Sequence, residues 1–140
     1  MPEFDGLKLC FRDNGLAGFH DIRRIEINRR EDKLQLGRIG LVGNGGNSGF
    51  QALNLAVQFG AKRILLIGLD MSLSGGVHWY GPNKWPNANN PNDSNFKRWI
   101  DAFEGSAALL KSMGVEIINC SMNSAIQCFP KRSLEDAIPA

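Results

Sequence analysis

The chain has 140 residues, of which 43% are hydrophobic and 21% are charged, and its formal net charge is +2 at pH 7. These values are typical of one globular domain with its own core, and the charge is too small to indicate nucleic-acid binding. No apolar run is long enough to cross a membrane and no signal-peptide pattern is present, so we expect a cytoplasmic protein without a membrane partner. Cys10, Cys120 and Cys128 lack metal-ligand spacing and are expected to be reduced thiols.

The first third of the chain predicts short strands joined by turns. Residues 7–11 alternate weakly between apolar and polar side chains, and residues 22–27 combine β-branched with charged residues, which is typical of an edge or half-exposed strand. The charged run at residues 29–33 contains both signs and is expected to be the solvated tip of a hairpin. Residues 34–42 would then form the return strand of that hairpin. His20 stands alone in a turn-rich segment and is expected to be structural or exposed.

A glycine-rich loop at residues 43–49 leads into the most regular helix pattern of the chain. Residues 48–59 are apolar except for a thin, uncharged polar stripe, which consists of Gln51, Asn54 and Gln58. Such a helix is expected to be largely buried. Asn47 or Ser48 can cap its start, and Gly60 suits the left-handed position just past its end.

The junction between this loop and this helix predicts an anion site. Glycines let a backbone approach a ligand closely, and the first N–H groups of a helix lack partners within the helix. The helix dipole adds partial positive charge at the same place. We therefore expect Asn47, Ser48 and Gly49 to contact a phosphate of the ligand. The alternative is a plain turn, in which glycine and asparagine are also common.

Two alternating helices and strands follow the loop. Residues 64–67 form a continuous apolar run, residues 94–113 predict a second helix that ends at Gly114, and residues 115–119 form the next strand. This order predicts right-handed crossovers and a parallel sheet, in which ligands bind outside the carboxyl ends of the strands. Asp70 lies at such an end. It can bind a ribose hydroxyl or a Mg²⁺ ion held by phosphates, or it can cap its own loop.

The long segment at residues 71–93 lacks periodicity, which indicates a functional lid or a disordered loop. It concentrates the side chains of His78, Trp79, Tyr80 and Trp85. Aromatic rings can stack on bases or sugars, a tyrosine hydroxyl can bond a phosphate, and a histidine suits general acid–base catalysis. The alternative is that Trp79 and Tyr80 pin the loop to the core while His78 is merely exposed.

Further candidate ligand contacts lie near the C-terminus. Ser121 follows the carboxyl end of a predicted strand. Lys131 and Arg132 can neutralise a phosphate from the second side of a cleft, and a solvated basic pair is the alternative. Ser133 and Asp136 have the spacing of a capped short helix. The sequence contains no Walker lysine, Ser-His-Asp signature or paired metal-ligand motif.

Several of these segments together resemble a known group of proteins. The segments are residues 47–52 (NSGFQA), 60–71 (GAKRILLIGLDM), 78–81 (HWYG), 114–121 (GVEIINCS) and 124–130 (SAIQCFP). In this order they resemble phage and prophage proteins related to the MptE-like (hydroxymethylpterin diphosphokinase-like) group. They are similar, more distantly, to bacterial sialyltransferases of glycosyltransferase family forty-two.

This resemblance covers residues 40–137 and leaves residues 1–39 as a divergent N-terminal segment. It implies one Rossmann-like α/β domain over residues 1–140, with a mostly parallel sheet flanked by helices. The chain looks like the C-terminal half of that fold, because no first half of the nucleotide site stands before residue 40. We therefore expect a fold that is incomplete at its N-terminus.

The resemblance also implies a nucleotide-linked or pyrophosphate-containing ligand. In that case Ser48 and Gly49 would touch the nucleotide, Asp70 would form the floor of the site, and Tyr80 would reach a phosphate. The expected function is a nucleotide-dependent transferase of the glycosyl- or pyrophosphoryl-transfer type, or a remnant of one. Mg²⁺ bound at Asp70 is the possible cofactor, and His78 is the possible base.

Two alternatives to an enzyme are open on the sequence. One is a protein that binds a nucleotide or nucleotide-sugar without turning it over. The other is an oligomeric phage-associated protein, in which a partner chain covers the sheet edge left by missing strands. We expect a homo-oligomer in either case.

Overall fold

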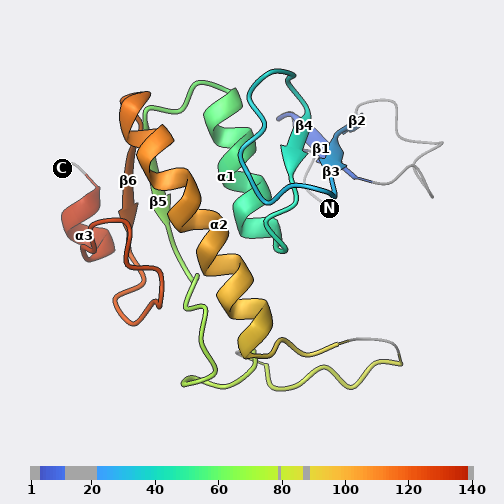
Figure 1. Cartoon of the computed structure of the whole chain (residues 1–140), viewed down its shortest axis with the longest axis vertical. Coiled ribbons are helices and arrows are strands. Elements are labelled where there is room, and N and C mark those ends of the chain that lie inside the picture. The colour runs from blue at the N-terminus through green and yellow to red at the C-terminus, as the bar shows by residue number, and fades with distance from the viewer. Residues whose placement is uncertain (1–3, 12–21, 79, 87–88, 139–140) are drawn as a thin grey trace.

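The computed structural model describes residues 4–11, 22–78, 80–86 and 89–138 (Figure 1). Its elements in chain order are β1 (Lys8–Cys10), β2 (Ile22–Arg24), β3 (Glu26–Asn28), β4 (Leu41–Gly43), α1 (Ser48–Gln58), β5 (Arg63–Leu66), α2 (Asp93–Ser112), β6 (Glu116–Asn119) and α3 (Leu134–Ala137).

The strands of the described residues pair only in parallel. β1 pairs with β2, β3 with β4, and β5 with β6. Parallel pairing of the two strands that flank the second helix is therefore confirmed. The continuous sheet that the sequence analysis expected is not formed, because these strands make separate two-stranded sheets.

Local signals place both long helices where the sequence predicts them. Asn47 caps α1, and a reciprocal pair of Asn92 and Asn95 forms a capping box at the start of α2. Gly60 and Gly114 follow the C-cap residues of the two helices, Phe59 and Met113, with φ of 85° and 69°. This is the left-handed conformation that ends a helix and that glycine adopts without strain.

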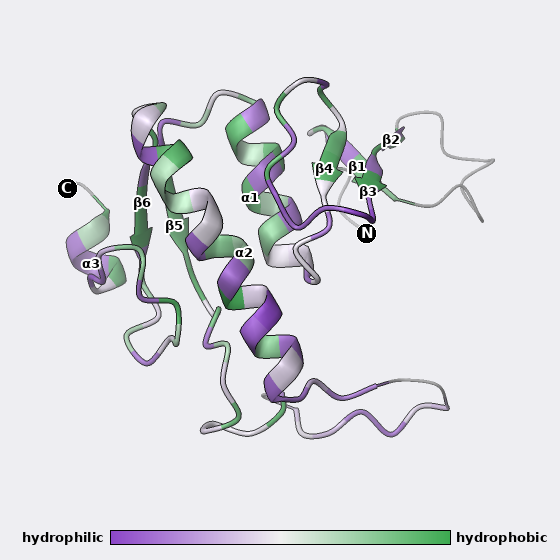
Figure 2. Ribbon diagram, viewed as in Figure 1, coloured by the Kyte–Doolittle hydropathy of each residue, from purple (hydrophilic) through white to green (hydrophobic). Residues whose placement is uncertain are grey.

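The hydrophobic core lies between the two long helices and the β5–β6 pair. α1 and α2 lie side by side, next to the β5–β6 pair (Figure 1). Phe50 of α1 meets Phe103 of α2 edge to face, with ring centroids 5.5 Å apart and planes at 89°. Hydrophobic residues dominate β5 and β6, whereas hydrophobic and hydrophilic patches alternate along α2 (Figure 2). The strands contribute Leu66 and Ile117 to this core.

The polar stripe of α1 is buried and bonds to backbone groups of residues 35–44. The Asn54 side chain is fully buried, and its Oδ1 accepts the N–H groups of Gln35 and Gly43, both at 2.9 Å. Its Nδ2 donates to the carbonyl of Gln35, also at 2.9 Å.

The two glutamines of the stripe bond to the backbone in the same way. Gln58 donates to the carbonyls of Gln35 and Leu41, each at 2.6 Å. Gln51 donates to a carbonyl at residue 44 at 2.9 Å. The predicted stripe therefore faces inward rather than toward solvent.

These bonds explain why the sheet stops at β4. The carbonyl of Leu41 and the N–H of Gly43 point to the same edge of the strand, since they are two residues apart. The side chains of Gln58 and Asn54 occupy that edge. A neighbouring strand would need the same two backbone groups for its own hydrogen bonds, so β5 cannot pair with β4 at that edge.

The predicted hairpin at residues 22–42 is wrong. β3 and β4 are parallel, with Ile27 opposite Val42, so residues 29–40 cross back along the pair instead of turning at its end. The crossover has no helix of its own, and its polar backbone groups are satisfied by Asn54, by Gln58 and by a bond from the N–H of Asn44 to the carbonyl of Glu31. Alternating apolar residues predict a strand but not the direction of its partner.

We expect Asn54→Leu to lower the free energy of unfolding by about 3 kcal/mol, because it leaves buried backbone groups of Gln35 and Gly43 without partners. Urea denaturation followed by circular dichroism measures this. The same substitution at the exposed Asn123 is the matched control and should stay within about 0.5 kcal/mol of the unmodified protein. A similar small effect at Asn54 would show that its amide does not hold the crossover.

Candidate functional site

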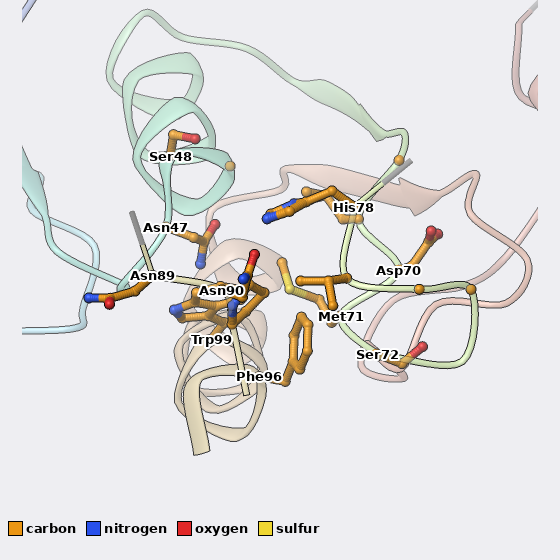
Figure 3. A pocket seen from close by; sticks show the side chains of 17 residues that line it. Asn47, Ser48, Asp70, Met71, Ser72, His78, Asn89, Asn90, Phe96 and Trp99 are labelled. Atoms are coloured by element: carbon orange, nitrogen blue, oxygen red, sulfur yellow. The ribbon is translucent and has the colours of Figure 1, made fainter. Parts of the chain in front are cut away.

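A cavity of about 630 Å³ opens at the start of α1. Its wall comes from the first residues of α1, the loop after β5, both arms of the segment between β5 and α2, and the first two turns of α2 (Figure 3). This volume suits a small-molecule ligand. It brings together Ser48, Gly49, Asp70 and His78, which the sequence analysis selected from three separate segments.

The start of α1 presents two open backbone donors. Ser48 and Gly49 are the first two helical residues and line the cavity. In the described part of the chain, no protein acceptor takes their N–H groups. The third N–H, that of Phe50, is occupied, because Asn47 Oδ1 accepts it at 2.8 Å. Asn47 also donates to the carbonyl of Gly45 at 2.9 Å. Both polar atoms of its side chain thus have protein partners, and the side chain caps the helix instead of contacting a ligand.

The glycines before the helix have a packing role. Gly45 and Gly46 have φ of 55° and 72°, which favours glycine. A Cβ on Gly45 would overlap the ring of Phe50, and one on Gly46 would lie 2.5 Å from Cδ1 and Nε1 of the Trp99 indole. Neighbouring rings therefore account for these two glycines without any phosphate.

An ion pair ties the crossover at residues 29–40 to α2. Arg98 donates from Nε and Nη2 to the two carboxylate oxygens of Asp32, at 2.7 and 2.8 Å. The hydrogen bond and the charge of Arg98 hold the pKa of the Asp32 carboxyl below its ordinary value. The backbone N–H of Gly45 also helps to lower the pKa of the Asp32 carboxyl. The bidentate geometry fixes the crossover at Asp32 against the second turn of α2.

The loop after β5 is shaped by the segment that follows β6. Ser121 Oγ accepts the N–H groups of Gly68 and Leu69, at 2.8 and 3.2 Å, and Ser124 Oγ donates to the carbonyl of Leu69 at 2.6 Å. Ser121 is thus committed to the loop, and it is not part of the cavity wall. Met71 closes the loop with a φ of 54°, unusual for a residue other than glycine, and its side chain is buried.

Asp70 reaches the cavity at its rim. Its backbone carbonyl accepts the N–H of Ala125 at 2.8 Å. Its carboxylate points away from the side chains of Met71 and Phe96 (Figure 3). Among the residues that the structure describes, no cluster of three or more His, Cys, Asp or Glu side chains could hold a metal ion. A Mg²⁺ ion at Asp70 would therefore take most of its ligands from phosphate oxygens and water.

His78 lines the cavity and belongs to a loop whose residues are hydrogen-bonded to one another. Its ring stacks on Tyr80 at a centroid distance of 4.9 Å with planes at 7°. Asn83 connects the loop, because its side chain bonds both His78 Nε2 and the Tyr80 hydroxyl at 3.2 Å. Asn83 N–H donates to Asn90 Oδ1 at 2.7 Å, which joins the two arms that line the cavity. Trp79, also predicted as a ligand contact, lies outside the described residues.

The remaining predicted contacts lie elsewhere. Tyr80 supports His78 from outside the cavity wall. Lys131 Nζ donates to the carbonyls of Ser124 and Met122, at 2.6 and 3.3 Å, and so stabilises a turn. Arg132 is exposed, and neither basic residue belongs to the cavity wall. Burial raises the pKa of the Cys128 thiol to about 11, so it does not supply a thiolate nucleophile at neutral pH.

Sequence reasoning missed the apolar side of the cavity. Met71, Phe96 and Trp99 line it together, and they gather on the side opposite His78 (Figure 3). Both aromatic residues lie in the predicted second helix, where the sequence indicated only that they share one face. Their position in the first two turns of α2, directly after the long segment at residues 71–93, was the feature of the sequence that could have indicated a place at the cavity wall. No lysine or arginine belongs to the described wall of the cavity.

No protein-family model, curated protein or solved structure matches this chain. No helix among the described residues has the length and apolar character needed to cross a membrane.

We expect the Asp32–Arg98 pair to make stability depend on acid pH. The pKa of Asp32 is lower in the folded chain than in the unfolded chain, so its stabilisation is fully present above the unfolded value of about 3.9. It is lost as the pH falls through the lower folded value. Because the pair is partly exposed, Asp32→Asn should cost at most about 1 kcal/mol at pH 6.

Urea denaturation from pH 6 down to pH 2.5 measures this difference. The gap between the unmodified protein and Asp32→Asn should shrink below about pH 4, where the unfolded carboxyl begins to take up a proton. Asp5→Asn, which changes an exposed carboxylate, is the control and should show no such gap. A gap that stays constant with pH would contradict the role of the ionised carboxylate.

Proposed function

We propose that this protein binds a nucleotide-linked ligand, such as a nucleotide-sugar, in the cavity at the start of α1. We further propose that it is a nucleotide-dependent transferase with a Rossmann-like arrangement. One observation carries the proposal: the open N–H groups of Ser48 and Gly49 share a cavity of about 630 Å³ with Asp70 and His78. Anion donors and two titratable groups are thereby available to a single ligand.

In this proposal each part of the wall has a separate task. The N–H groups of Ser48 and Gly49 hold a phosphate at the positive end of α1. Asp70 binds a ribose hydroxyl from the rim, or a Mg²⁺ ion carried by the phosphates. His78 exchanges a proton with the group that accepts the transferred moiety. The two loop arms that meet at Asn83 and Asn90 shield the ligand from water.

The position of the cavity agrees with this proposal. It borders the loop that directly follows β5 and lies at the carboxyl end of a parallel strand. Ligands of open parallel α/β sheets bind at that edge, because loops and helix starts gather there. The described strands supply this edge even though the sheet is interrupted between β4 and β5.

The substitution Ser48→Pro tests the anion site without disturbing the helix. Proline is favoured at the first helical position, and it removes the N–H group. Asn47 has φ of −149° and ψ of 156°, an extended conformation that suits a residue before proline. We expect Ser48→Pro to weaken nucleotide-sugar binding about tenfold or more, because a hydrogen bond to a charged group is lost. Isothermal titration calorimetry over a panel of nucleotide-sugars, with Mg²⁺ present and absent, measures the affinity.

Ser48→Ala is the matched control, since it removes the hydroxyl and keeps the N–H. It should bind within about threefold of the unmodified protein if the backbone donor is the relevant group. Thermal melting of both variants should match the unmodified protein. An unchanged affinity in folded Ser48→Pro, or the absence of binding by every panel member, would overturn the proposed anion site.

A second candidate is ligand binding without turnover, and two observations favour it. Asn83 already occupies Nε2 of His78, and the Asp70 carboxylate points away from the apolar side of the cavity. The side chains of His78 and Asp70 therefore do not face a common point in the cavity. This reading retains the cavity and the anion site but assigns no proton transfer to His78.

Nucleotide release from the bound nucleotide-sugar separates the two candidates. For a transferase we expect His78→Gln to lower the release rate at least about 100-fold, which is the usual contribution of a general acid or base. Its affinity for the nucleotide-sugar should change less than about threefold. Liquid chromatography of the released nucleotide measures the rate. Binding of the nucleotide-sugar with no release by the unmodified protein would favour the second candidate.

A further inference from the structure

Trp99 belongs to the wall of the cavity but has no polar partner there. It lies in the second turn of α2 and is only partly buried, unlike the fully buried core ring of Phe103. In the part of the chain that the structure describes, no acceptor takes the N–H of its indole ring. A large, partly buried ring at the wall of a cavity offers a flat apolar surface to a ligand.

The indole ring of Trp99 is held in place from two sides. Phe96 meets it edge to face, with centroids 5.2 Å apart and planes at 85°. The backbone of Gly46 lies against Cδ1 and Nε1, where a Cβ would come within 2.5 Å of both atoms. The ring therefore has little freedom to lose when a ligand stacks on it, and this lowers the entropic cost of binding.

The other residues of the cavity wall make a contact between the ligand and the Trp99 ring important for binding. No lysine or arginine lines the described cavity, so an anionic ligand would be held there without the charge of a basic side chain. Met71 lies beside Trp99 and Phe96 and extends the same apolar surface (Figure 3). Sulfur and aromatic groups both make favourable contacts with a planar ring.

We infer that Trp99 is the stacking platform for a nucleobase, and that Met71 and Phe96 complete its apolar surround. This inference rests on the proposed function and deepens it, since it assigns the base of the nucleotide to this part of the cavity. Gly46 lies against the Trp99 ring and is two residues from Ser48, so the platform on α2 and the anion site meet at the glycine loop. The base and the phosphate would thus be bound on the two sides of the contact between α2 and this loop.

The test compares probes that carry or lack a base. The probes are the four common nucleoside 5′-monophosphates, the matching nucleosides without phosphate, and ribose 5-phosphate. Isothermal titration calorimetry gives each affinity for the unmodified protein and for Trp99→Leu, Trp99→Phe and Trp85→Leu. Trp85→Leu is the matched control, because Trp85 is 76% exposed and lies outside the cavity wall.

We expect Trp99→Leu to weaken the tightest nucleoside monophosphate about tenfold, as loss of one base–aromatic stack does. Trp99→Phe should recover most of the affinity, Trp85→Leu should leave it unchanged, and ribose 5-phosphate should bind all four proteins equally. In ¹⁵N-labelled unmodified protein, the indole N–H signal assigned to Trp99 should shift with nucleosides and not with ribose 5-phosphate. This second measurement needs no folded Trp99→Leu variant.

Two results would overturn the inference. One is a nucleoside monophosphate that binds no tighter than ribose 5-phosphate, and the other is an indole signal of Trp99 that does not respond to any base. Failure of the proposed anion site gives a different pattern. In that case Ser48→Pro would leave every affinity unchanged, while nucleosides without phosphate would still shift the Trp99 signal.

Discussion

One buried amide, that of Asn54, organises the half of the structure that leads to the cavity. Three hydrogen bonds from its side chain join α1 to the crossover at Gln35 and to β4 at Gly43. Because these groups are buried, any other arrangement would leave them unpaired at considerable cost. The helix is therefore locked along β4, and its start is placed at the carboxyl end of that strand. The open N–H groups of Ser48 and Gly49 reach the cavity as a result.

The second half of the cavity wall is built in the same way. Hydroxyl groups of Ser121 and Ser124 hold the loop after β5, and Asn83 holds the segment that carries His78. Many polar side chains near the site are thus engaged in shaping it. The surfaces left for a ligand are backbone donors at the helix start, titratable groups near the rim, and an apolar side that includes Trp99. The described part of the cavity wall lacks basic side chains, so the proposed anion and ring contacts rely on backbone donors and apolar residues.

Much of the local structure could be predicted, because it depends on residues close together in the chain. Apolar spacing located α1 and α2, and the glycines at 60 and 114 ended them in the expected left-handed conformation. The cap at Asn47 was equally local. The cavity residues Ser48, Gly49, Asp70 and His78 were found because helix starts and strand ends gather at one edge of parallel strands. Helix bounds to within a residue, the cap at Asn47 and the parallel pairing of β5 with β6 therefore follow from the amino-acid order, whereas the sequence indicated Asp93 or Ser94 as the cap of α2 and the structure has Asn92.

Other features depend on contacts between distant residues. The polar stripe at Asn54 predicted a buried helix, but an amide side chain does not specify which backbone it will bond, so the parallel crossover was mistaken for a hairpin. Ser121 has the same position in the chain whether it faces a ligand or supports a loop. Trp99 fits the apolar pattern of a helix equally well in a core or at a cavity wall. Only the packing of α2 against the glycine loop distinguishes these roles, since burial is a property of the assembled surfaces.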